Sequence, residues 1–155
     1  MTSVTVLLVD DHAVVREGYR LLLERAGDIH VVGEAATAAE AVERYAALSP
    51  QVVVMDIALP GASGIEALRE VRSRDADARV LMFSMYEETI YAERALKAGA
   101  QGYVTKASAP ATLVEAVRTV ASGKPYLTPS VAQALALKSL AAETSSASAL
   151  SAREF

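Results

Sequence analysis

The chain has 155 residues, of which 52% are hydrophobic and 22% are charged, and its formal net charge is −4. This composition predicts one globular domain with a real core and a short appendage, and it excludes a disordered chain. The absence of cysteine excludes disulfides and thiolate metal sites, and no long basic run provides the footprint that duplex nucleic acid needs.

The N-terminus leads directly into a strand-like segment that starts at Val4. It lacks the basic region and the following apolar region of a signal peptide. No apolar run approaches the length of a membrane span. We therefore expect a cytoplasmic protein that has no contact with a membrane.

Five short apolar runs alternate with helical patterns along the chain. The predicted strands are residues 4–9, 29–34, 52–55, 80–83 and 102–105. Three of these runs are rich in Val, Leu and Ile with little polar alternation, which is typical of strands that are covered on both faces. The alternation predicts an α/β fold in which helices cover both faces of a parallel five-stranded sheet.

Helix signals lie between the strands. Residues 37–40 and 63–66 each fit a capping box, and Gly99 suits the position that ends a helix. Pro110 suits the first turn of the last helix. Helices are predicted over residues 14–26, 37–48, 63–71, 87–98 and 109–122.

The pattern changes near Gly123, so the first domain is predicted to cover residues 1–123. Residues 124–149 read as a linker that contains a short helix over about 129–142 with Thr128 as its N-cap. The small polar residues 143–149 read as flexible. Residues 150–155 begin a helical pattern without room to finish it, and this predicts the opening of a further, missing domain.

Polar side chains stand where four of the predicted strands end. Asp10 and Asp11 follow the first strand, Asp56 the third, Ser84 the fourth and Lys106 the fifth. The carboxyl ends of parallel strands share one edge, so these side chains are expected to meet in one pocket. Each alone has an ordinary explanation as a turn former, a cap or a solvated residue. It is much less probable that four strand ends all carry such residues by coincidence.

Such a pocket suits a divalent cation and a phosphoryl group. Clustered carboxylates repel one another unless they are protonated or neutralised, and Mg²⁺ prefers oxygen ligands together with a phosphate oxygen. Asp56 can act as a nucleophile toward phosphorus and form an aspartyl phosphate. Lys106 and Ser84 can hydrogen-bond to the oxygens of that phosphoryl group.

These residues also lie in motifs of a known family. Four segments resemble the receiver domain of two-component response regulators over residues 4–123 in order and spacing: Val9-Asp10-Asp11-His12, Val54-Met55-Asp56-Ile57-Ala58-Leu59-Pro60-Gly61, Leu81-Met82-Phe83-Ser84 and Tyr103-Val104-Thr105-Lys106. Residues 11–18 resemble the NarL/FixJ subfamily, and residues 150–155 are similar to the start of a LuxR-type helix-turn-helix domain. The resemblance implies a doubly wound (βα)5 fold of the flavodoxin-like, CheY-like type with strand order 2-1-3-4-5.

The resemblance also implies a role for each acid. Asp56 would accept a phosphoryl group from a histidine on a sensor kinase. Asp11 and Asp56 would ligate Mg²⁺, or another divalent cation, directly. The backbone carbonyl of Ala58 would be a third protein ligand, and Asp10 would act through water.

Three further residues receive roles from the same resemblance. Lys106 would bridge to Asp56 and then to the phosphate. Ser84 would be the switch hydroxyl and Tyr103 the switch aromatic, whose ring follows the hydroxyl inward. An ordinary strand aromatic with its hydroxyl at the rim is an equally good interpretation of Tyr103.

The implied protein is a phosphorylation switch that controls transcription, rather than an enzyme that turns over a substrate. Its partners would be a sensor histidine kinase, a second copy on phosphorylation, and DNA through the missing C-terminal domain alone. Two surfaces are candidates for the dimer interface. The first consists of residues 87–98, the fifth strand and residues 109–122. The second consists of the first and fifth helices. The helix over 129–142 could pack on the receiver, pair with a partner or restrain the missing domain.

Three other functions are weighed against this one. An aspartate-based phosphatase usually has a second acid two residues after the nucleophile, where Ala58 stands, and it needs a substrate cap for which the chain has no room. A flavodoxin-like cofactor binder needs a phosphate-cradling loop after the first strand, where Asp10 and Asp11 would repel the phosphate. A receiver-like interaction module that works without phosphorylation is the remaining alternative.

Overall fold

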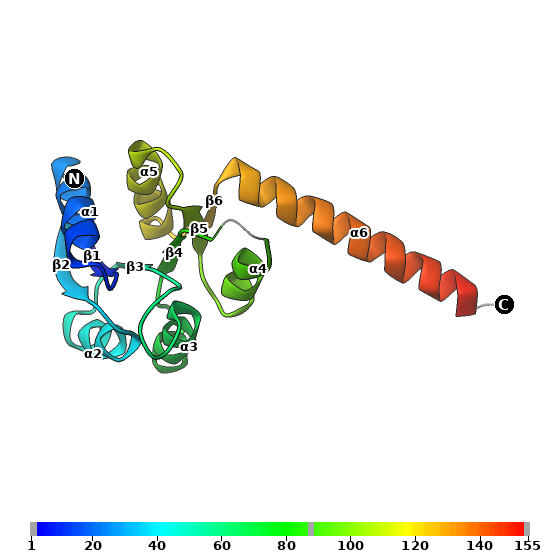
Figure 1. Ribbon diagram of the computed structural model, residues 1–155, viewed down its shortest axis with the longest axis horizontal. Coiled ribbons are helices and arrows are strands. Elements are labelled where there is room, and N and C mark those ends of the chain that lie inside the picture. The colour runs from blue at the N-terminus through cyan, green and yellow to red at the C-terminus, as the bar shows by residue number, and fades with distance from the viewer. Residues whose placement is uncertain (1–2, 87–88, 154–155) are drawn as a thin grey trace.

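The computed structural model describes residues 3–86 and 89–153, and it describes side chains up to residue 141. Strands and helices alternate along the chain (Figure 1). The elements are β1 (Val4–Val9), α1 (Ala13–Arg25), β2 (Ile29–Ala35), α2 (Ala38–Leu48), β3 (Val52–Met55), α3 (Gly64–Arg74), β4 (Val80–Ser84), α4 (Thr89–Lys97), β5 (Gly102–Thr105), α5 (Pro110–Ala121), β6 (Tyr126–Leu127) and α6 (Pro129–Arg153).

The strands form one parallel sheet in the order β2-β1-β3-β4-β5-β6. The first five strands and their order agree with the prediction, but the prediction of a five-stranded sheet was wrong by one strand. β6 pairs with β5 through Gly102 opposite Tyr126 and Tyr103 opposite Leu127. β6 consists of only two residues, which follow a Gly-Lys-Pro segment and are too few to show the alternating pattern of a strand. The strand forms because the outer edge of β5 is free to pair with it.

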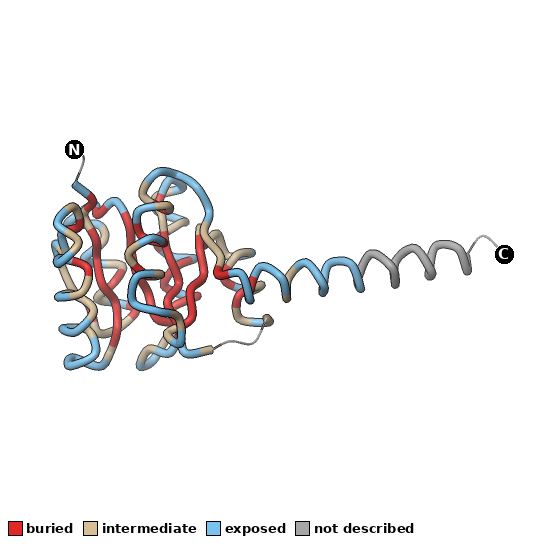
Figure 2. Tube along the Cα trace, turned by 90° about the horizontal axis from the view of Figure 1, so that it is seen from above, coloured by how far each residue is buried: buried red, intermediate tan, exposed pale blue. Residues whose placement is uncertain are grey.

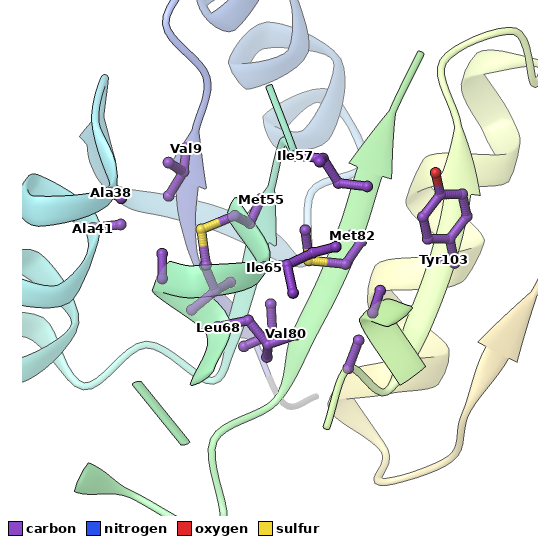
Figure 3. Close-up of a cluster of buried hydrophobic side chains, with 14 of the residues drawn as sticks. Val9, Ala38, Ala41, Met55, Ile57, Ile65, Leu68, Val80, Met82 and Tyr103 are labelled. Atoms are coloured by element: carbon purple, nitrogen blue, oxygen red, sulfur yellow. The ribbon is translucent and has the colours of Figure 1, made fainter. Parts of the chain in front are cut away.

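Helices cover both faces of the sheet (Figure 1). One core cluster lies between the sheet and α1 and α5, where Leu23, Leu113 and Val117 are buried. The other lies between the sheet and α2, α3 and α4, and Figure 3 shows part of it, with Leu68 and Met82 among its members. β1, β3, β4 and β5 are buried along nearly all of their length (Figure 2), as their nearly continuous apolar runs require, whereas β2 is fully buried only at Ile29 and Ala35.

The predicted helix boundaries agree with the structure to within a few residues. Thr37 and Ser63 cap α2 and α3, since their side-chain oxygens accept hydrogen bonds from the backbone N–H of Glu40 and Glu66. Gly99, the second residue after α4 ends, adopts φ +107°, a conformation that favours glycine. The predicted start of the fourth helix at residues 87–88 lies outside the described residues.

The last helix is much longer than predicted. α6 continues through residues 143–149, which were predicted to be a flexible linker. Between residues 130 and 153 the chain contains neither glycine nor proline and is rich in alanine, so nothing ends the helix. Thr128 precedes α6, but its buried hydroxyl has no hydrogen-bond partner among the described residues, and the predicted capping bond does not form. The side chains of residues 150–155 lie outside the described part of the chain.

The start of α6 packs on the α/β domain, which was one of the three arrangements left open. Val131 is buried and Leu135 packs beside it against the core cluster under α4. Lys138 forms an ion pair with Glu93 of α4, with 2.5 Å between Nζ and Oε2. Beyond these residues α6 extends away from the body of the protein (Figures 1 and 2). Among the described residues, no helix has both the length and the apolarity needed to cross a bilayer.

Candidate functional site

Asp10 and Asp56 lie side by side at the carboxyl edge of the sheet because β1 and β3 are neighbours. The backbone N–H of Asp56 donates to the carbonyl of Val9 at 3.1 Å, and that of Asp10 donates to the carbonyl of Ala35 at 3.0 Å. Asp10 is 2% exposed and Asp56 6%. The sheet hydrogen bonds therefore bring two acids that are 46 residues apart into one buried position.

Lys106 joins these two acids. Its Nζ donates to Asp10 Oδ2 at 2.7 Å and to Asp56 Oδ2 at 2.9 Å. Burial lowers the pKa of the ammonium, but the hydrogen bonds to the two carboxylates outweigh burial and hold the pKa of Lys106 above its usual 10.5. The ammonium is therefore charged at neutral pH and offsets part of the negative charge in the pocket.

Asp11 and His12 complete the acidic group on the β1–α1 turn. Ligand atoms of Asp10, Asp11 and His12 all lie within 4.8 Å of one another. Asp11 Oδ1 is shielded from solvent, and among the described residues no donor reaches it with hydrogen-bond geometry. Its neighbour, His12 Nδ1, lies 3.1 Å away and forms an ion pair only when the imidazole is protonated.

The carboxylates of Asp10 and Asp11 fit a hard divalent cation. Carboxylate oxygens are the ligands that Mg²⁺ prefers, and a shielded carboxylate oxygen without a hydrogen bond is suited to accept a cation. The sequence prediction omitted His12, although its position next to Asp11 was a signal that it would reach the same turn.

The loop after β3 wraps closely around Asp56. The backbone N–H of Ala58 donates to Asp56 Oδ1 at 3.2 Å, and that of Gly64 donates to the carbonyl of Ile57 at 2.8 Å. A Cβ on Gly64 would lie 1.9 Å from the carbonyl oxygen of Asp56, so glycine is required for this approach. The metal role predicted for the carbonyl of Ala58 stays a prediction.

Ser84 and Tyr103 lie on the other half of the sheet, at β4 and β5. Ser84 is fully buried, and its carbonyl accepts a hydrogen bond from the N–H of Lys106 at 2.8 Å. Its Oγ accepts from the N–H of Tyr86 at 3.1 Å, and the hydroxyl of Tyr103 donates to the carbonyl of Tyr86 at 2.6 Å. Tyr103 is also fully buried, and its role as the switch aromatic stays a prediction.

Tyr86 connects these hydroxyls to α4. Its ring stacks on that of Tyr91, with centroids 4.4 Å apart and planes inclined by 19°. The sequence prediction missed this connection because a stack between a loop and a helix has no periodic signal. Tyr86 and Tyr91 also line a surface hollow of about 570 Å³ together with Asp11 and Ala58, so the acidic pocket opens toward solvent beside the stack.

The chain resembles known proteins over most of its length. Residues 6–118 match the response regulator receiver domain family. The response regulator UvrY of Escherichia coli is 40% identical over 140 residues, which are 90% of this chain and 64% of that protein. GacA of Pseudomonas syringae is 40% identical over 136 residues, 88% of this chain and 64% of that protein. The crystal structure of a LuxR-family two-component response regulator from an Aurantimonas species has a TM-score of 0.87 and 46% identity, and it covers 90% of this chain and 99% of that chain.

The family match spans more than half of the chain, including every strand end described above. The resemblance to LuxR-type regulators is confirmed by the Aurantimonas structure. The chain covers 64% of the length of the curated relatives, so the match concerns their receiver part and the residues that follow it. The chain belongs to the response regulator receiver domain family.

Proposed function

We propose that this protein is a phosphorylation switch in which Asp56 is the phosphoacceptor. The observation that carries the proposal is the buried Asp56 carboxylate, which is bound by Lys106 and placed beside two further acids. A carboxylate oxygen of Asp56 attacks the phosphorus of a phosphohistidine. The O–P bond forms while the P–N bond breaks, and the imidazole leaves with the electron pair and takes up a proton.

Asp11 and Asp56, with the carbonyl of Ala58, are the proposed direct ligands of Mg²⁺, and Asp10 acts through water. When bound there, the ion would neutralise charge on the phosphoryl oxygens. Lys106 moves its hydrogen bond from the Asp56 carboxylate to a phosphoryl oxygen, while its bond to Asp10 holds the ammonium in place.

Ser84 and Tyr103 form the proposed response element. Ser84 turns its hydroxyl toward a phosphoryl oxygen, which disturbs the hydrogen bond that Oγ accepts from Tyr86. Tyr86 in turn contacts both Tyr103 and Tyr91, so the change reaches α4. Because Glu93 of α4 binds Lys138, the same path extends to α6. A contact difference of a few kcal/mol is enough to shift such a two-state element.

The whole protein is proposed to be a cytoplasmic regulator of transcription rather than an enzyme with turnover. A sensor histidine kinase supplies the phosphoryl group. A DNA-binding domain that begins with residues 150–155 supplies the output, and phosphorylation promotes formation of a homodimer. The resemblance to UvrY, GacA and a LuxR-family regulator supports this assignment.

The test is incubation with Mg²⁺ and acetyl phosphate, followed by intact-mass measurement. We expect the wild type to gain the mass of one phosphoryl group, and Asp56→Asn to gain none. Asp77→Asn, which alters an exposed acid after α3, is the matched control and should gain the same mass as the wild type. A wild type without any gain would contradict the proposal and favour an interaction module that works without phosphorylation.

A further inference from the structure

Arg16 binds the backbone between the two acids of the β1–α1 turn. It lies near the start of α1, and its side chain is 18% exposed. Its Nη1 donates to the carbonyl oxygen of Asp10 at 2.6 Å, and its Nε donates to Glu34 Oε1 on β2 at 2.9 Å. The carbonyl of Asp10 belongs to the peptide unit that leads to Asp11. One guanidinium therefore links this peptide unit to the neighbouring strand.

Helix formation does not explain an arginine at this position. The N-terminal end of a helix carries a partial positive charge, which disfavours a cation there. His12 occupies the N-cap of α1 but makes no side-chain capping hydrogen bond, so this helix start lacks the usual side-chain cap. Within the turn, the backbone N–H of His12 donates to Asp10 Oδ1 at 2.9 Å, and Arg16 adds a contact from outside it. The contacts with Glu34 and the Asp10 carbonyl compensate for the unfavourable position and hold the turn.

We propose that Arg16, oriented by Glu34, is a positioning residue that holds the Asp10–Asp11 turn in the geometry that binds Mg²⁺. This role rests on the phosphoacceptor function proposed above. The planar guanidinium has donors in a fixed fork, so it can bind the carbonyl and the carboxylate at the same time. A lysine keeps the positive charge at this position but lacks the fork.

Charge alone predicts the opposite effect on metal affinity. A guanidinium bound to the backbone of the acidic turn repels an incoming cation, so its removal would tighten Mg²⁺ binding if only Coulomb forces acted. If Arg16 positions the turn, its removal instead weakens binding, because the carboxylates of Asp10 and Asp11 are no longer held in place. The sign of the change in dissociation constant therefore distinguishes the two roles.

The same helix provides a matched control. Arg20 forms ion pairs with Glu17 and Glu24 on the exposed surface of α1. Like Arg16, it is an arginine of α1 that pairs with carboxylates. Its partners lie on the same helix, however, and it makes no hydrogen bond to the backbone of the Asp10–Asp11 turn, which the structure describes in full. Arg20→Ala removes an arginine from α1 and leaves the turn intact.

The experiment is calorimetric titration of the full chain with Mg²⁺. Partners that orient metal ligands typically contribute roughly tenfold or more to metal affinity, so we expect Arg16→Ala and Arg16→Lys to raise the dissociation constant by about that factor. Arg20→Ala should stay within about twofold of the wild type, because long-range surface charges are screened by salt. In phosphorylation by acetyl phosphate, the Mg²⁺ concentration at half-maximal rate should rise in the Arg16 variants, while the rate at saturating Mg²⁺ changes little.

Two results would overturn this role of Arg16 and leave the phosphoacceptor function standing: tighter Mg²⁺ binding in Arg16→Ala, or wild-type affinity in Arg16→Lys. A wild type that binds no Mg²⁺ would contradict the proposed function itself. If the Arg16 variants do not fold, Glu34 provides the test. Glu34→Gln keeps the oxygen that accepts from Nε and should retain affinity, whereas Glu34→Ala should lose it; equal affinities would overturn the proposal.

Discussion

The two halves of the sheet edge are held very differently. On the β1–β3 half, α3 covers the strand that bears Asp56 and buries five residues, namely Gly64, Ile65, Ala67, Leu68 and Val71. On the β4–β5 half, α4 covers the strands that bear Ser84 and Tyr103 and buries two alanines, Ala92 and Ala95. Because apolar stabilisation grows with buried area, α3 is held much more firmly than α4. The proposed chemistry thus lies on the firm half and the proposed response on the half that we expect to move more readily, here called the movable half.

The largest expected effect is on the firm half, at Gly64. In Gly64→Ala the new Cβ would meet the Asp56 carbonyl oxygen at 1.9 Å, and neither backbone can move without displacing Asp56. Overpacking of this kind costs roughly 3 kcal/mol or more of unfolding free energy. Urea unfolding measures the loss, and phosphorylation by acetyl phosphate should fall with it.

Gly18 provides a control of opposite sign. It lies inside α1, and a Cβ there would meet nothing within 4 Å. Gly18→Ala should raise the unfolding free energy by about 0.5–1 kcal/mol, because alanine loses less conformational freedom in a helix. If Gly64→Ala and Gly18→Ala have equal unfolding free energies, the β3–α3 loop tolerates movement. The β1–β3 half would then not be held more firmly than the β4–β5 half.

The second prediction concerns the movable half. Tyr103→Phe removes the donor to the Tyr86 carbonyl and should lower the unfolding free energy by about 1–2 kcal/mol. The acids and Lys106 are untouched, so phosphorylation of Asp56 should proceed at the wild-type rate. Hydrogen exchange of α4 should change less on phosphorylation than it does in the wild type.

Tyr45→Phe is the matched control for Tyr103→Phe. It removes a comparable hydrogen bond, from the Tyr45 hydroxyl to Asp75 Oδ2 at 2.7 Å, between α2 and the end of α3. This variant should keep the full response of α4. A wild-type response in Tyr103→Phe, or a lost response in Tyr45→Phe, would contradict the path through Tyr86.

The third prediction uses Lys106, which connects the two halves. Its folded pKa lies above 10.5, so its stabilising contribution is fully present below that pH and is lost as pH rises through the higher folded value. Tyr45 and Tyr126 also have raised pKa values, mainly through burial, and add to the alkaline loss. The difference in unfolding free energy between wild type and Lys106→Met isolates the lysine and should shrink at strongly alkaline pH.

The sequence predicted the strand ends well because parallel-sheet geometry converts chain order into position. Once the runs before Asp10 and Asp56 are taken as neighbouring buried strands, their ends must share an edge. Caps at Thr37 and Ser63 were predictable for a related reason, since their signals lie within four residues. Features that depend on a local sequence pattern or on regular sheet topology could therefore be predicted from the sequence.

Contacts between side chains that are distant in the sequence could not be predicted. The pairs Arg16–Glu34 and Lys138–Glu93 each join two elements, and neither residue type is unusual on a helix or strand surface. The strand Tyr126–Leu127 depends on the free edge of β5 rather than on its own composition. The length of α6 was misjudged because small polar residues were read as flexible, although an alanine-rich stretch without glycine or proline can remain helical.

The smallest expected effect separates α6 from α4. Glu93 binds Lys138 of α6 and Lys97 of α4 itself, and these two lysines lower the pKa of its carboxyl, Lys138 more strongly. Lys138→Ala should speed hydrogen exchange at the start of α6 severalfold, since an exposed ion pair contributes little alone but here adds to the packing of Val131. Lys97→Ala removes a partner of the same carboxylate without loosening α6, so it should leave that exchange unchanged. If both variants behave alike, the ion pair with Lys138 does not hold α6 on the movable half, and the path from Ser84 would end at α4.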